Sequence, residues 1–464
     1  MEAGLFRFLR FSLGLEGEVK DLLDDRQGSF DWDACYQFAK RQTLVGVLFD
    51  GIQRLPKELA PARPLLLRWL SDSESIRRRN MRMDRASAYV YNKVCAAGFR
   101  CCILKGQGNA LLYPHPSSRI PGDVDVWVMT NREELPHIAL SLTDGDGSSL
   151  QESLNHIGLT VHGVSVELHS TPALLNSPLH NSRLQKWLKR NADLQCSNRI
   201  ALPNNAGEVA VPTLSFNIIY QLCHLFHHCF YEGVGLRQIV DYYFVLMNTD
   251  FSGNTDEASG NTDCFSGNTD CDGVLSNTDF TDNTDRIGGN AESDGSLMNT
   301  DCTDFTDSSS GDFEGDGCLL NTDCADFLDS SSGGLGEVDS GGALVALQEE
   351  LKWLGLWEFA GAVMYVLREV MGLDEKRMIC APDERRGRLL LEEIMAGGNF
   401  GHYDTRNHFG QGALWHNIQR FRRDWRMLRF YPSEALSEPL FRAWHFLWRW
   451  KQKHTGMPKE RNLN

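Results

Sequence analysis

The sequence predicts an α+β protein in which a small mixed β-sheet is flanked by helical regions on both sides in the chain. Residues 99–200 alternate short apolar strands with helical segments, whereas residues 1–98 and 343–464 place apolar side chains at helical spacing. Residues 248–342 have a low-complexity composition that separates them from the rest. A chain of 464 residues is too long for one small core, so we expect several regions.

We divide the chain into four parts. They are a helical N-terminal region (1–98), an α/β core (99–200), a helical C-terminal region (201–247 and 343–464), and a long acidic insertion rich in Asn-Thr-Asp (248–342).

The insertion carries most of the negative charge of the chain. It contains 22 acidic residues and one arginine, a charge of −21, so the remainder of a chain of net charge −16 is near +5. Few apolar side chains are available to offset the entropy of ordering, and the Asn-Thr-Asp tripeptides recur at irregular intervals. We therefore expect a disordered segment rather than a stack of regular repeats.

Cysteine usage and hydropathy place the protein in a reducing, aqueous compartment. The thirteen cysteines show neither a repeated C-x-x-C pattern nor spacing suited to zinc. No apolar run reaches the length of about 18 residues that a membrane span needs. A cytoplasmic location without a membrane partner is the expectation.

Two segments outside the core carry clustered charge or aromatic residues. Residues 71–74 have the form of a capping box and predict a long helix that ends at Gly98. Its arginines at 77, 78, 79 and 82 indicate a solvated face, with a contact to a triphosphate as the alternative. The Trp- and Arg-rich segment 415–425 indicates a core stripe rather than a surface for nucleic acid or membrane.

Two aspartates stand on one strand of the core. Residues 100–128 predict an apolar strand, a Gly turn, a brief helix, a Pro-rich loop and a second strand that carries Asp123 and Asp125. Because side chains alternate along a strand, both carboxylates project from one face. A divalent cation with oxygen ligands is the usual relief of their repulsion.

A turn and a third carboxylate complete this pattern. Lys105 and Gly106 end the first strand where a helix begins, and the N–H groups of a helix N-terminus favour phosphate. Glu167 lies on an alternating strand at 164–169 and shares a face with His169. A strand paired beside the aspartates would bring Glu167 to the same ion.

These residues resemble the nucleotidyltransferase superfamily of the DNA polymerase beta type. The resemblance rests on the strand, the Gly turn, Arg119, the sequence Gly-Asp-Val-Asp at 122–125 and the later acidic strand. The superfamily usually has Gly-Gly or Gly-Ser after the first strand, where this chain has Gly106 and Gln107.

The chain is more closely similar to a largely uncharacterised bacterial branch of that superfamily. The segments that carry this similarity are LKG…YP.P..R..GDVDVWV at 104–128, Glu-Leu-His at 167–169, His-Leu-Phe-His-His at 224–228, Gly-Leu-Arg…Asp at 235–241 and Gly-Asn-Phe-Gly at 398–401. From residue types alone, the histidines at 224–228 indicate packing and hydrogen bonding. Arg237 and Asp241 are spaced i, i+4 and indicate a salt bridge. The similarity favours the alternative that Arg237 faces the cleft.

The resemblance implies transfer of a nucleoside monophosphate from a nucleoside triphosphate to an acceptor hydroxyl, with release of pyrophosphate. Asp123, Asp125 and Glu167 would bind two Mg²⁺ (or Mn²⁺) ions, and Glu167 completes the second ion site or acts as the base. The predicted nucleotide-binding residues are Lys105, Gly106 and Arg119.

The acceptor is left open among a small molecule, a protein and RNA. The alternative function is a catalytically inactive nucleotide-binding or protein-interaction module that keeps the fold.

Overall fold

The computed structural model describes residues 2–19, 23, 30–143, 150–153, 156–251, 340–404, 406 and 413–454. The described residues belong to one compact unit formed from residues 1–253 and 338–464. The predicted disordered insertion at 248–342 lies almost entirely outside them. The described elements are helices around a mixed sheet, which confirms the predicted α+β class.

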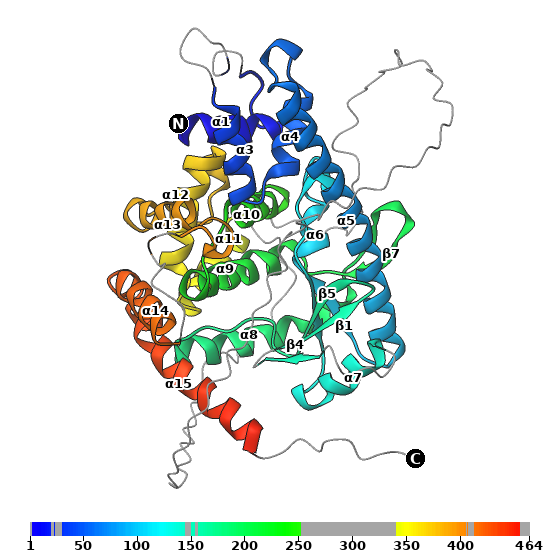
Figure 1. Cartoon of the computed structure of the whole chain (residues 1–464). Coiled ribbons are helices and arrows are strands. Elements are labelled where there is room, and N and C mark those ends of the chain that lie inside the picture. The colour runs from blue at the N-terminus through cyan, green and yellow to red at the C-terminus, as the bar shows by residue number, and fades with distance from the viewer. Residues whose placement is uncertain are drawn as a thin grey trace. The chain divides into compact units, whose positions relative to one another are not determined.

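A five-stranded sheet forms the centre of the α/β core (Figure 1). Its strands are β1 (Cys101–Leu104), β2 (Val124–Val128), β3 (Gln151–Glu152), β4 (His156–Val161) and β5 (Val164–His169). The spatial order is β1-β2-β5-β4-β3, in which β2 and β5 are parallel and all other neighbours are antiparallel. The sheet is therefore mixed, as predicted.

The two faces of β2 have different neighbours because its side chains alternate. Val124, Val126 and Val128 are buried on one face. On the other face Trp127 stacks on Phe216 of α9 (Leu214–Tyr231), with ring centroids 5.8 Å apart. Phe216 in turn stacks at 4.6 Å on Trp187 of α8 (Pro178–Ser197). Asp125 shares the Trp127 face, so α8 and α9 flank the side of the sheet that carries the carboxylates.

The N-terminal region is helical as predicted, but its longest helix begins earlier. The helices are α1 (Glu2–Ser12), α3 (Trp32–Arg41), α4 (Val45–Gln53) and α5 (Arg63–Ala96). The predicted capping box at 71–74 is wrong, since these residues lie inside α5, which has a proline in its first turn. Proline presets the helical φ and needs no N–H partner there, so it marks the start. The end is as predicted, with Gly98 at φ 88° directly after α5.

Short elements complete the core. They are α6 (Gly106–Ala110), α7 (Leu135–Leu142) and a hairpin of β6 (Arg199–Leu202) with β7 (Gly207–Ala210). The hairpin extends the strand-containing part of the chain beyond residue 200, where the sequence predicted only helices.

Helices resume after the hairpin. They are α9, α10 (Leu236–Asn248), α11 (Ser340–Trp353), α12 (Trp357–Met371), α13 (Glu384–Gly397), α14 (Ala413–Leu428) and α15 (Pro432–His454). Gly355 separates α11 from α12 and takes φ +71°, a conformation that L side chains rarely adopt. Buried side chains from Leu5 to Ala435 form one hydrophobic cluster, so the helical regions and the sheet share a core.

The prediction that the Trp- and Arg-rich segment at 415–425 forms a core stripe is wrong for those of its aromatic residues that the structure describes. Phe421 and Trp425 are 60% and 67% exposed, and Trp444 on α15 is 52% exposed. Helical spacing places such residues on one face without saying whether another element covers that face. No helix in the described part of the chain combines the length and apolar composition that crossing a bilayer requires.

Glycines allow a loop after α13 to touch the turn between α9 and α10. Gly401 has φ +69°, and a Cβ placed on it would lie 2.1 Å from the Glu232 carbonyl oxygen. A Cβ on Gly233 would lie 3.0 Å from the Gly401 nitrogen. The Gly-Asn-Phe-Gly segment at 398–401 therefore supports the end of α9 through backbone contact that only glycine permits.

Gly401→Ala is expected to destabilise the protein by about 1–3 kcal/mol, since the added methyl group overlaps a backbone atom. Gly397→Ala is the matched control, because a Cβ there meets nothing within 4 Å. Urea unfolding of both variants measures the difference. Equal unfolding free energies in the two variants would contradict the proposed contact.

Candidate active site

Parallel pairing of β2 and β5 gathers three carboxylates. Asp125 lies directly opposite Glu167 in the register, and Asp123 immediately precedes β2. One ligand oxygen from each of the three residues lies within 4.8 Å of the others. The expected clustering is therefore present. Oxygen ligands at this spacing fit a hard divalent cation, although the metal-binding role itself stays a prediction.

Asp123 has the least compensated charge of the three. Burial, followed by the charges of Asp125 and Glu167, raises the pKa of Asp123 to about 7. A cation placed among the carboxylates would remove the repulsion that causes part of this shift.

Asp125 is held between two cationic groups. Lys105 Nζ lies 2.8 Å from its Oδ2, and His169 Nε2 lies 3.0 Å from its Oδ1. Burial would raise the pKa of Asp125, but Lys105 and His169 outweigh it and hold the pKa below its usual range. Asp125 is therefore ionised at neutral pH although it is only 4% exposed.

Glu167 faces a pair of histidines. His169 Nε2 lies 3.3 Å from Glu167 Oε2, and His156 Nε2 lies 3.6 Å from Oε1. Burial would lower the pKa of His169, but the hydrogen bonds that it donates to Asp125 and Glu167 raise it to about 9. The Glu167 side chain is 28% exposed, so this carboxylate is open to water.

The Gly turn places Lys105 beside the aspartates through a strained backbone. Lys105 has φ 49° and ψ −128°, a conformation that costs a non-glycine residue about 1–3 kcal/mol. A Cβ on Gly106 would lie 3.6 Å from the Asp123 carbonyl oxygen, so the turn packs on the chain just before β2. Lys105 and Gly106 are thus brought to the carboxylates, as the sequence predicted.

Gln107, where the superfamily usually has a small residue, is a structural link to α5. It is 4% exposed, and its amide donates a hydrogen bond to Asp84. Its side chain therefore contacts α5 and does not occupy the mouth of the site.

The histidines of α9 form hydrogen bonds, as predicted, but the sequence analysis missed that they link Lys105 to Glu232. His224 Nε2 lies 3.2 Å from Lys105 Nζ and 2.9 Å from His228 Nε2. His228 Nδ1 lies 3.1 Å from Glu232 Oε2. Burial and then the charge of Lys105 lower the pKa of His224 well below its usual value, so its neutral ring accepts from the ammonium. The i, i+4, i+8 spacing was the signal that could have indicated a connected row.

Arg119, predicted to bind nucleotide, lies in a buried ion pair. Its Nε and Nη2 each donate to an Asp241 oxygen at 2.7 Å, and the Tyr113 hydroxyl donates to Oδ1 at 2.7 Å. Arg119 is 3% exposed. The guanidinium therefore fixes the loop before β2 to α10.

The predicted salt bridge between Arg237 and Asp241 is replaced by this pair. Arg237 Nη1 instead donates to the Ile120 carbonyl at 2.9 Å. The alternative, in which Arg237 faces the cleft, is closer to what is observed. Arg237 Nη1 lies 3.9 Å from a Cβ placed on Gly122, which is next to Asp123.

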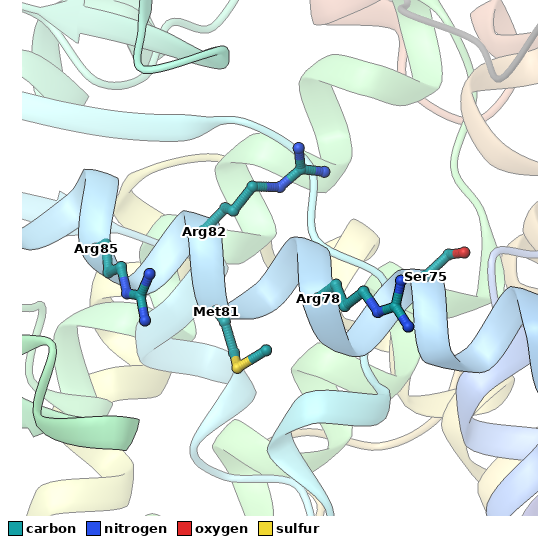
Figure 2. Close-up of a pocket in the computed structure, with 5 residues that line it drawn as sticks. All are labelled: Ser75, Arg78, Met81, Arg82 and Arg85. Atoms are coloured by element: carbon teal, nitrogen blue, oxygen red, sulfur yellow. The ribbon is translucent and has the colours of Figure 1, made fainter. Parts of the chain in front are cut away.

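The arginines of α5 divide into two groups. Arg79 Nη2 donates to the Gly122 carbonyl at 3.2 Å and so supports the chain before Asp123. Arg78 and Arg82 are exposed, as a solvated face requires, and they line a shallow hollow of about 390 Å³ on α5 with Ser75, Met81 and Arg85 (Figure 2). None of the predicted site residues lines this hollow.

Comparison with protein families agrees with this geometry. Residues 28–258 match a family model described as an uncharacterised nucleotidyltransferase. The matched range includes the five-stranded sheet and every predicted site residue. No curated protein and no solved structure matches the chain.

Asp241→Asn is expected to cost about 3–5 kcal/mol of unfolding free energy, because it leaves the Arg119 guanidinium buried beside a neutral group. Combining Arg119→Met with Asp241→Leu should recover most of this loss. Asp193→Asn is the control, since its ion pair with Arg100 is exposed and worth under about 1 kcal/mol. If the effects of Arg119→Met and Asp241→Leu on unfolding free energy were strictly additive, Arg119 and Asp241 would not be coupled.

Asp123→Asn and Asp125→Asn should act in opposite directions in metal-free buffer. A carboxyl whose pKa is raised on folding contributes stability at low pH that is lost as pH rises through about 4 to 7. Asn at 123 removes this loss, so the variant should unfold at a higher thermal midpoint than the unmodified protein between pH 5 and pH 8.

Asp125→Asn should lower the midpoint throughout the same range, because Lys105 and His169 lose their buried counter-charge. Thermal unfolding of both variants in chelator at four pH values makes the comparison. The assigned electrostatics would be wrong if the two variants shifted the midpoint in the same direction.

Proposed function

Since residues 28–258 belong to an uncharacterised nucleotidyltransferase family, we propose that the protein transfers a nucleoside monophosphate from a nucleoside triphosphate to an acceptor hydroxyl. The observation that carries the proposal is the gathering of Asp123, Asp125 and Glu167 within 4.8 Å beside Lys105.

The three carboxylates would hold divalent ions, of which Mg²⁺ is the expected one. Asp123 and Asp125 would hold the ion on the triphosphate, and Glu167 would complete the second ion site near the acceptor or act as the base. Such ions supply charge stabilisation at the phosphates and make an acceptor hydroxyl more acidic. The donor set fits because all three residues offer oxygen, the ligand that hard cations prefer.

Lys105 provides the positive charge for the phosphates. Its Nζ lies between Asp125 and His224, and the side chain is 17% exposed. Phosphoryl transfer depends mainly on positioning and electrostatics, so one fixed ammonium beside the carboxylates is a suitable contact for a triphosphate oxygen. We do not extend this role to Arg119, because Asp241 binds its guanidinium.

The reaction forms a bond between the acceptor oxygen and the α-phosphorus and breaks the bond from that phosphorus to the bridging oxygen of pyrophosphate. The acceptor proton goes to a base. Glu167 is the proposed base, since its carboxylate is partly exposed, and its contact with His169 lowers its pKa against the effect of burial and so keeps it ionised and able to accept a proton.

Gln107 is the departure from the superfamily's usual turn that would favour the inactive-module alternative. With the Gln107 amide bound to Asp84, the departure from the usual turn has a structural explanation. The described residues offer no observation that favours the alternative.

Glu167→Gln and Asp123→Asn should reduce Mg²⁺-dependent ATP affinity by at least about tenfold, as expected for loss of an ion ligand. Calorimetry with and without Mg²⁺ measures binding, and release of pyrophosphate from labelled nucleoside triphosphates measures transfer. Glu208→Gln on β7 is the control, because this glutamate is exposed and outside the cluster. Unchanged binding and pyrophosphate release in both site variants would refute the proposal.

A further inference from the structure

Two histidines lie beside Glu167, and one of them, His169, also contacts Asp125 at 3.0 Å. His156 of β4 is directly opposite His169 of β5 in the antiparallel register. Their rings are 5.2 Å apart between centroids. Glu167 lies two residues before His169 on the same face, and the residue opposite Glu167 is Gly158. The β4 residue directly opposite Glu167 therefore has no side chain, and the β4 side chain that faces the carboxylate is His156.

The distances from the two imidazoles to Glu167 match the spacing of metal ligands, and His169 Nε2 also lies 3.0 Å from Asp125 Oδ1. Nε2 of His156 is 3.6 Å from Glu167 Oε1, and Nε2 of His169 is 3.3 Å from Oε2. Charge-assisted hydrogen bonds are about 2.7–2.9 Å long. Ligands at about 2.0–2.1 Å from a tetrahedral ion are separated by about 3.3–3.4 Å.

The ligand types differ from those of the three-carboxylate cluster. One ligand atom each from His156, Glu167 and His169 lies within 4.8 Å of the others, as is also true of Asp123, Asp125 and Glu167. Imidazole nitrogen favours divalent transition ions, whereas carboxylates alone suit Mg²⁺. Glu167 belongs to both groups, so its two oxygens can serve two different ions.

We propose that His156, Glu167 and His169 form a metal site for a divalent transition ion such as Mn²⁺, Co²⁺ or Zn²⁺, and that Glu167 bridges it to the aspartates. The proposal deepens the proposed function by giving the ion near the acceptor a nitrogen ligand set. The existence of the site does not depend on nucleotidyl transfer.

The site remains open to solvent on one side. The side chains of His156 and Glu167 are 24% and 28% exposed, whereas that of His169 is 7% exposed. Three protein ligands with one accessible side leave a coordination position for water or an acceptor oxygen, which is the usual arrangement of catalytic rather than structural zinc sites.

Co²⁺ is the probe for the test, because its visible absorption reports nitrogen and oxygen ligands directly. The full chain, treated with chelator and then placed in excess Mg²⁺, is titrated with Co²⁺ and followed by absorbance. We expect saturation at one equivalent that excess Mg²⁺ does not reverse. His156→Ala should weaken Co²⁺ binding by at least about tenfold and leave Mg²⁺-dependent ATP binding measurable.

The matched variants separate this site from the aspartates. His162→Asn is the control, since His162 is an exposed histidine at the tip of the same β4–β5 hairpin with φ 50°, which asparagine tolerates. Asp123→Asn should keep Co²⁺ binding and lose ATP binding, and Glu167→Gln should lose both.

Two results would overturn the proposal. One is the absence of Co²⁺ absorption at one equivalent, and the other is a Co²⁺ titration unchanged by His156→Ala, which would make the histidines hydrogen-bonding partners of Glu167 only. Co²⁺ binding by an unmodified protein that shows no Mg²⁺-dependent ATP binding would contradict the proposed function and leave the metal site standing.

Discussion

The burial of the Asp125 carboxylate is the constraint on which the rest of the site depends. An ionised group that is 4% exposed must be paired, and its two partners come from different places in the sheet. Lys105 follows β1 and His169 ends β5, so the ion pairs join the strands on both sides of β2. The strained φ of Lys105 is one cost of this arrangement, since the residue that ends β1 must turn sharply to bring its ammonium to Asp125.

A second buried carboxylate holds the loop that leads into β2. Asp241 binds Arg119 and Tyr113, which come from opposite ends of the segment between α6 and the Gly-Asp-Val-Asp motif. Because the loop is fixed at α10, the position of Asp123 depends on a helix more than 100 residues away in the chain. An arginine beside a candidate active-site motif can therefore be conformational in role, and its substitution would misplace the aspartates rather than remove a phosphate contact.

Local patterns predicted much of this architecture, but partners distant in sequence decided the remainder. Period-two alternation was enough to place Asp123 and Asp125 together, and an acidic strand with Glu167 was recognisable on its own. The roles of Arg119 and His156 were not predictable, because Asp241 is 122 residues from Arg119 and the place of His156 depends on the register of β4 against β5. The false capping box shows the same limit, since its Asp72 accepts instead from Tyr36 of a different helix.

The helices after the acidic insertion also support the site, although the matched family range ends at residue 258. The polar row that begins at Lys105 runs through His224 and His228 to Glu232, where α9 ends. Phe400 packs against the His228 ring at 5.2 Å, and Gly401 rests on the Glu232 carbonyl. The Gly-Asn-Phe-Gly segment therefore fixes the far end of a row whose near end holds the ammonium. Since α13 presents this segment, a chain cut at the family boundary would keep every carboxylate yet lose part of what positions Lys105.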